Sequence, residues 1–138
     1  MSPIKIAIVT RKAKEIKKDL LELEKYSRMD KKDYLTSYEA QLSSERLLEK
    51  IIGRMIDINF HILKEKHGVL PNDYFQSFML MGEKKEISSD LASDLASAAG
   101  MRNVLAHEYD AIDNQMVYEA IHRALIQVPE YLKKVVEK

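Results

Sequence analysis

The residues best suited to do chemistry lie together in segment 102–109, which reads RNVLAHEY. Arg102 carries a permanent charge and a planar set of donors that matches phosphate oxygens. His107 can take up or release a proton near neutral pH. Tyr109 offers a phenolic oxygen that can accept a modifying group. The segment therefore predicts a site that holds a phosphate and moves a proton, within a chain that otherwise resembles a scaffold.

Composition limits the classes of protein to which the chain can belong. Its 138 residues are 46% hydrophobic, which predicts one compact domain over residues 1–138. Lys and Arg total 22 and Asp and Glu total 22, so an RNA-handling protein would need a local cleft rather than a globally basic surface. The chain has no cysteine, which excludes disulfides and thiolate metal sites and fits a cytoplasmic location. We find no membrane-spanning run, and we interpret residues 1–11 as part of the domain rather than a signal peptide.

Helical spacing of apolar residues dominates the chain and predicts an all-α antiparallel bundle of about five helices, one of them very long. The expected helices are 3–26, 31–67, 71–82, 88–109 and 113–136, with a kink or restart at Pro129 in the last. At ~1.5 Å per residue, helix 31–67 would be roughly 55 Å long, so we expect part of it to pack on a second subunit. Its apolar side comprises Leu35, Tyr38, Leu42, Leu48, Ile52, Met55, Ile56, Ile62 and Leu63.

The position of Arg102 within helix 88–109 needs an explanation. Arg102 and Tyr109 share a stripe with Leu91 and Leu95, where an unpaired buried charge would be very costly. Arg102 must therefore have an acidic partner or face a wet cleft that holds an anion. An ideal helix separates Arg102 from His107 by about 140°, so either the helix loosens near Gly100 or past Ala106, or the site is composite, as a two-fold dimer would make it. The alternative is a structural salt bridge, a core histidine and a packed tyrosine.

The chain resembles the HEPN superfamily, and within it the HepT-like toxin branch. Arg102 is followed by Asn103, by His107 five positions on and by Tyr109, on the fourth helix of a cysteine-free bundle. Segment 56–63, IDINFHIL, looks like the second helix of that branch, and the later helices follow in the expected order. The resemblance covers most of the chain from about Leu35 onward and implies a HEPN-like bundle that dimerises.

The resemblance also implies a function, which is metal-independent endoribonuclease activity at a dimer cleft with the RNA 2′-hydroxyl as nucleophile and no cofactor. His107 would be the general acid and base, Arg102 would hold the scissile phosphate, and Asn103 would be a polar helper. The expected partner is an MntA-like nucleotidyltransferase antitoxin, which would neutralise the toxin by adenylylating Tyr109.

Other polar patterns leave alternatives open. Asp57 and His61 lie four residues apart and could support the same cleft, although an exposed local pair is the slightly preferred interpretation. Glu119 and His122 form the Glu-x-x-His pattern of di-iron bundles, but the chain has only one such motif, so a metal site is not expected. The zero net charge also fits a non-catalytic helical module that binds a nucleotide or partner beside a nucleotidyltransferase.

Overall fold

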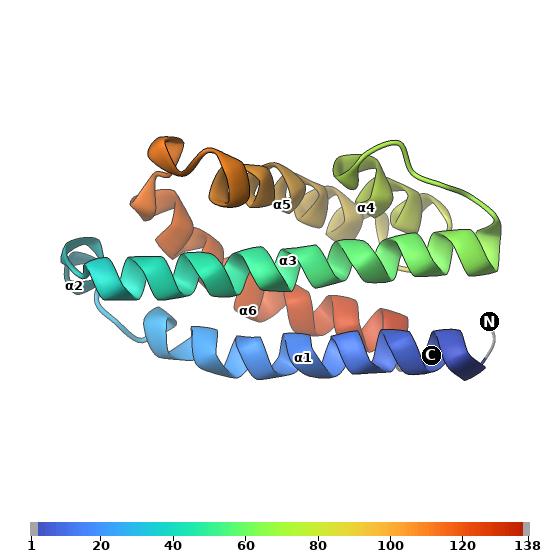
Figure 1. The fold of residues 1–138 in the computed structure, drawn as a ribbon, viewed down its shortest axis with the longest axis horizontal. Coiled ribbons are helices and arrows are strands. Elements are labelled where there is room, and N and C mark those ends of the chain that lie inside the picture. The colour runs from blue at the N-terminus through green and yellow to red at the C-terminus, as the bar shows by residue number, and fades with distance from the viewer. Residues whose placement is uncertain (1–2, 137–138) are drawn as a thin grey trace.

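The computed structural model describes the backbone of residues 3–136 and the side chains of residues 6–136. These residues form six α-helices and one short 3₁₀ turn without any β-strand, which confirms the predicted all-α class (Figure 1). The elements are α1 (Pro3–Ser27), α2 (Lys31–Thr36), α3 (Tyr38–His67), α4 (Tyr74–Glu83), α5 (Ser89–His107), η1 (Tyr109–Ala111) and α6 (Asn114–Val136).

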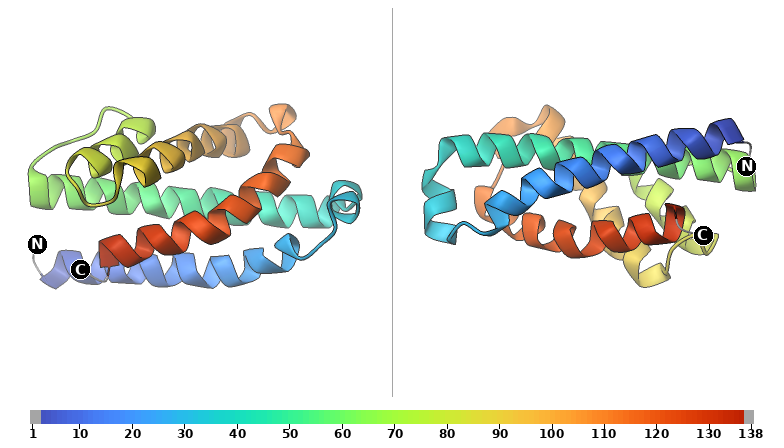
Figure 2. Two further views of the ribbon diagram at one scale, coloured as in Figure 1. Left: turned by 180° about the vertical axis from the view of Figure 1, so that it is seen from behind. Right: turned by 90° about the horizontal axis from the view of Figure 1, so that it is seen from below.

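Helix α3 lies at the centre of the bundle and contacts every other α-helix. In Figure 1, α1 lies on one side of α3, and α4 and α5 lie on the other side. The two views of Figure 2 show that α6 crosses α3 and runs beside α1, so that α1 begins and α6 ends at the same end of the bundle. No helix of the described residues is long and apolar enough to cross a membrane.

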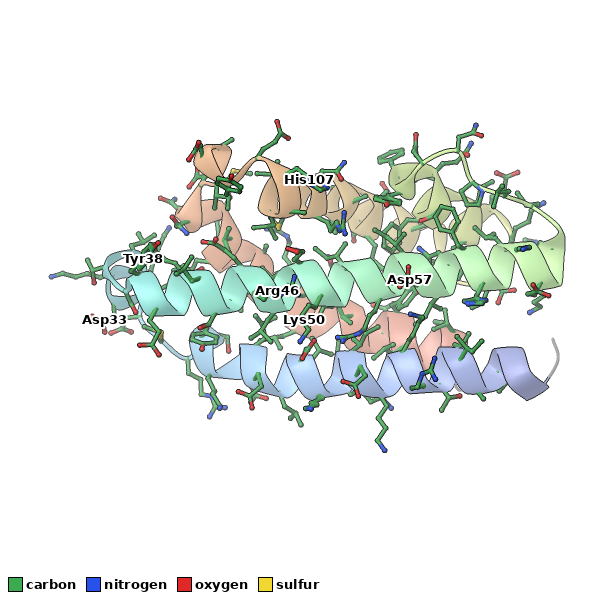
Figure 3. All side chains as sticks on the ribbon, viewed as in Figure 1. Asp33, Tyr38, Arg46, Lys50, Asp57 and His107 are labelled. Atoms are coloured by element: carbon green, nitrogen blue, oxygen red, sulfur yellow. The ribbon has the colours of Figure 1, made fainter. Side chains whose placement is uncertain are left out.

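The core forms where the apolar stripes of α1, α3, α5 and α6 meet. Most of the apolar side predicted for helix 31–67 is buried, namely Leu48, Ile52, Met55, Ile56, Ile62 and Leu63. The prediction is wrong at the start of that segment, where Leu35 is 38%, Tyr38 73% and Leu42 48% exposed. Figure 3 shows the reason for Tyr38, which lies at the first turn of α3, at the end of the bundle beside α2.

The predicted long helix 31–67 is interrupted at Ser37, which accounts for six helices instead of about five. The Ser37 hydroxyl accepts a hydrogen bond from the Ala40 amide at 3.1 Å and so caps α3. The Gln41 side-chain amide donates to the carbonyls of Tyr34 at 3.1 Å and Leu35 at 3.0 Å, which satisfies the end of α2. Helix α3 keeps 30 residues, about 45 Å at the usual rise.

Other helix ends follow the predicted signals. Gly68 adopts φ 64° and ends α3, a conformation that glycine accepts without steric cost. Ser88 caps α5 by accepting from the Leu91 amide at 3.1 Å, and Asp113 accepts from the first amides of α6. Helix α6 does not restart at Pro129, because its helical conformation continues to Val136.

Gly82 was predicted to end the helix before α5, but it lies inside α4, which continues to Glu83. A Cβ atom at Gly82 would come within 2.6 Å of the Ala92 Cβ of α5, closer than two carbon atoms can pack. The absence of a side chain at Gly82 thus allows α4 and α5 to approach closely.

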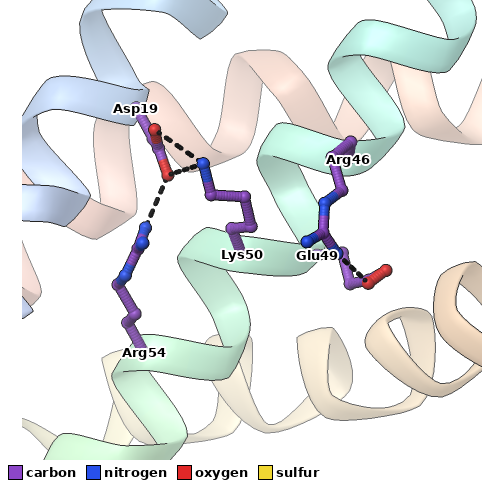
Figure 4. Close-up of polar contacts among 5 residues, drawn as sticks. All are labelled: Asp19, Arg46, Glu49, Lys50 and Arg54. Atoms are coloured by element: carbon purple, nitrogen blue, oxygen red, sulfur yellow. Dashed lines mark hydrogen bonds and ion pairs between the residues drawn. The ribbon is translucent and has the colours of Figure 1, made fainter.

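An ion-pair cluster joins α1 to α3 (Figure 4). Asp19 of α1 is only 5% exposed, and its carboxylate lies 2.6 Å from the Arg54 guanidinium and 3.4 Å from the Lys50 ammonium. Because the carboxylate is buried and paired twice, the cluster fixes the register of α1 against α3. It lies on the opposite side of α3 from α5 and takes no part in the site described next.

Candidate active site

Arg102 lies half-buried on α5 and has no acidic partner among the described residues. Its Nε atom is buried without a hydrogen-bond partner there, and its Cζ atom lies 5.6 Å from the centre of the Tyr74 ring. A cation above an aromatic face is stabilised by the ring quadrupole without being neutralised. Of the two explanations open for Arg102, the salt bridge is absent from this part of the chain, and its charge remains available to an anion.

A buried polar chain positions Tyr74 at the start of α4. The Tyr131 hydroxyl of α6 bonds to Asn59 Oδ1 of α3, and Asn59 Nδ2 donates to Ser77 Oγ at 3.2 Å. Ser77 Oγ in turn donates to the Tyr74 carbonyl oxygen at 2.7 Å. Burial raises the pKa of Tyr131 well above its ordinary value, so the phenol stays protonated and keeps its donor. Residues of three helices thus anchor the backbone of the first turn of α4, which carries the Tyr74 ring beside Arg102.

His107 is the last residue of α5, and its side chain is exposed. The interpretation of His107 as a core histidine is therefore wrong. No hydrogen bond or ion pair holds the imidazole among the described residues, so both ring nitrogens are available to a substrate. Helix α5 is continuous through Gly100, which keeps Arg102 and His107 about 140° apart around its axis. In Figure 3, His107 lies nearer the α2 end of the bundle than Asp57 does.

The predicted place of Tyr109 on the apolar stripe of α5 is wrong. At Glu108 the backbone leaves the helical region (φ −129°, ψ 49°), so Tyr109 begins the 3₁₀ turn η1 instead of continuing the helix. Its side chain is 70% exposed. The position of Tyr109 relative to Arg102 therefore does not follow from helical periodicity, and the Tyr109 hydroxyl is open to another protein.

The remaining predicted site residues divide into two groups. Asn103 follows Arg102 and is exposed beside it. Asp57 does not pair with His61 as the local interpretation expected, because its carboxylate lies 3.1 Å from the Lys12 ammonium of α1. No hydrogen bond, ion pair or ring contact of the described residues joins Asp57 or His61 to Arg102 or His107.

Glu119 and His122 do not build a metal site with other residues. Glu119 lies 4.0 Å from the Lys31 ammonium, and both ring nitrogens of His122 lie within hydrogen-bond distance of backbone carbonyls, one of them Ser27 at 3.1 Å. Across the described part of the chain, no three His, Asp or Glu side chains converge as metal ligands would. His122 instead links α6 to the end of α1.

Tyr74 falls in the predicted helix 71–82, where its residue type alone indicates no role in a site. The structure gives it a contact with Arg102 and 39% exposure. A tyrosine at the first turn of a helix carries no pattern that would distinguish this role. Together the site offers an unpaired guanidinium, an exposed imidazole at a helix end and an exposed phenol after it, which suits acid–base chemistry at a phosphate.

The fold is that of HEPN toxins. A tri-AMPylated Shewanella oneidensis HEPN toxin, solved in complex with MNT antitoxin, superposes with a TM-score of 0.86 over 100% of both chains at 20% identity. A toxin–antitoxin complex with AMP-PNP superposes with a TM-score of 0.87 over 96% of this chain and 99% of that one, also at 20% identity.

Sequence comparison narrows this class. The family model described as Ribonuclease HepT-like matches residues 16–135, and the chain belongs to that family. The tRNA nuclease HepT of Aphanizomenon flos-aquae is 37% identical over 135 residues, which cover 98% of this chain and 92% of the relative. The mRNA nuclease HepT of Shewanella oneidensis is 24% identical over 85 residues, which cover 62% of this chain and 64% of the relative. The predicted resemblance is confirmed.

Proposed function

We propose that the chain is a toxin endoribonuclease that cleaves RNA without a metal ion and acts in the cytoplasm, where its substrate is found. The observation that carries this proposal is Arg102, a half-buried guanidinium with no acidic partner among the described residues, followed by an exposed His107 at the end of α5. Family membership and nuclease relatives support the same reaction.

The proposed reaction needs only proton transfer and charge stabilisation. Neutral His107 takes the proton of the 2′-hydroxyl, and the 2′-oxygen attacks the adjacent phosphorus. The bond from phosphorus to the 5′-oxygen breaks, and an imidazolium returns a proton to that oxygen. Arg102 binds the phosphate oxygens as their charge grows, with Asn103 as a polar helper. The products are a 2′,3′-cyclic phosphate and a 5′-hydroxyl.

A second copy of the chain completes the proposed site. Arg102 and His107 project in different directions from one helix, so a single α5 does not direct both at one phosphate. A two-fold axis near the end of α5 would bring Arg102 of one copy to His107 of the other. No contact of the described residues joins Asp57 or His61 to Arg102 or His107, so both are assigned only a supporting role.

The first test is cleavage of RNA by the purified protein in excess EDTA. We expect cleavage to continue, because neither proposed step uses a metal ion, and we expect cyclic-phosphate and 5′-hydroxyl ends. End-group analysis by phosphatase and kinase treatment measures both. Complete loss of cleavage in EDTA, with recovery on adding a divalent ion, would contradict the mechanism. No cleavage but tight binding of a nucleotidyltransferase would favour the non-catalytic module instead.

The second test concerns Tyr109, the proposed site of neutralisation by an MntA-like nucleotidyltransferase. With ATP and that partner, the Tyr109 oxygen would attack the α-phosphorus and release pyrophosphate, and its exposed position supports access. We expect the intact mass of the protein to rise by the mass of one or more AMP groups. We expect the rate of RNA cleavage to fall, because the added anion repels RNA phosphates. Tyr109→Phe should abolish modification at this residue, with Tyr38→Phe as the exposed control. Two results would refute neutralisation through Tyr109. One is AMP labelling of the peptide that contains position 109 in the Tyr109→Phe variant, and the other is modification of Tyr109 without loss of RNA cleavage.

A further inference from the structure

A groove between the start of α4 and the middle of α5 lies directly beside the candidate active site. It encloses about 530 Å³, which is within the usual size of small-molecule sites. Its aromatic wall is Tyr74, which is 39% exposed, and Phe75, which is 55% exposed. The rest of its lining is Ala99, Gly100 and Asn103 of α5, of which the first two have no bulky side chain, and Asn72 and Asp73 just before α4. We name it the Tyr74–Asn103 groove.

Two polar side chains of the groove have no partner in the described structure, whereas Asp73, which also lines it, accepts a hydrogen bond from the Gln76 amide at 2.7 Å. The side-chain amides of Asn72 and Asn103 are exposed and make no hydrogen bond there. A carboxamide offers two donors and an acceptor, the combination that pairs with the edge of a nucleobase. Tyr74 also covers Arg102, so one aromatic ring borders both the groove and the proposed phosphate position.

These features match the parts of a nucleotide. An aromatic wall and the small residues Ala99 and Gly100 suit the face of a base, free carboxamides suit its edge, and the adjoining guanidinium suits its phosphate. We infer that the Tyr74–Asn103 groove holds one unpaired base of single-stranded RNA next to the scissile phosphate. The inference rests on the proposed function and adds a base subsite to it. A base held in a duplex has both faces stacked and does not fit this site.

Gly100 provides a sharp test of the groove. No atom lies within 4 Å of a Cβ built at Gly100, so a side chain there enters the groove instead of the core. Glycine is unfavourable inside a helix, so Gly100→Leu and the matched control Gly100→Ala should both fold. The leucine side chain projects into the groove and obstructs a base there, while the methyl group of alanine leaves most of the groove open.

The experiment uses an RNA whose cleavage position has been mapped with the wild-type protein. It is resynthesised with a single abasic residue at each position flanking the cut in turn. For one flanking position, we expect base removal to slow the wild type and Gly100→Ala about tenfold, the usual scale of one stacked base. Gly100→Leu should cleave the complete RNA as slowly as the wild type cleaves the abasic RNA, and it should cleave the abasic RNA no more slowly than the complete RNA.

Three results would overturn the inference. The wild type could cleave both abasic RNAs as fast as the complete RNA, or Gly100→Leu could still respond to base removal as the wild type does. A change in molar mass by light scattering for Gly100→Leu but not Gly100→Ala would assign the groove to contact with a second copy. A wild type that cleaves no RNA is a different outcome, because it refutes the proposed function itself and this subsite with it.

Discussion

Replacing His107 with alanine is expected to lower the rate of RNA cleavage by about a thousandfold, within the usual range for loss of a general acid–base group. His122 cannot take over, because both of its ring nitrogens lie within hydrogen-bond distance of backbone carbonyls. The exposed position of His107 at the end of α5 means that folding should be unaffected. Single-turnover cleavage under saturating protein measures the chemical step.

The matched control for this experiment is His122→Gln, which removes another exposed histidine. It should keep the wild-type cleavage rate, with any effect confined to the melting temperature. Thermal unfolding of His107→Ala should coincide with that of the wild type. A fully active His107→Ala protein would refute the assignment of the general acid–base group to this residue.

Replacing Arg102 has the second largest expected effect, a loss of about one hundredfold to one thousandfold in cleavage rate. Arg102→Lys should recover little of this loss, because an ammonium cannot bind two phosphate oxygens in a plane or stack as well on Tyr74. Arg123→Ala, on the exposed side of α6, is the matched control and should cleave normally. Equal activity of Arg102→Lys and the wild type would show that only a point charge is needed.

A mixture of the two inactive proteins tests whether the site is shared between copies. If Arg102 of one copy acts with His107 of the other, mixed dimers of Arg102→Ala and His107→Ala contain one complete pair and regain part of the activity. If each chain carries its own complete site, mixing restores nothing. The result depends only on the geometry of the dimer, because both variants keep the other catalytic residue.

The helices could be predicted from the sequence wherever their ends depend on local chemistry. Ser88 and Asp113 cap the following helices through their own side chains, so the signal lies within a few residues. The break at Ser37 could not be predicted in the same way. It depends on Gln41 binding carbonyls of the preceding turn and on a buried hydrogen bond from Tyr34 to Ser44, which spans ten positions.

The site shows the same division between local and distant causes. The stripe that places Arg102 beside buried leucines is a local property, and it correctly predicted a charged residue in need of an explanation. The answer, the ring of Tyr74, comes from another helix, and its position depends on Asn59 and Ser77. The error at Tyr109 has a different source, since helical periodicity was extended beyond the residue at which the backbone stops being helical.

The close approach at Gly82 has a mechanical consequence. Because α4 and α5 are in contact there, Tyr74 and Arg102 are held against each other, although they come from different helices. His107 and η1 lie at the opposite end of α5, beyond the part that α4 braces. The motif thus joins a cation held against a second helix to an imidazole at a helix end outside that contact.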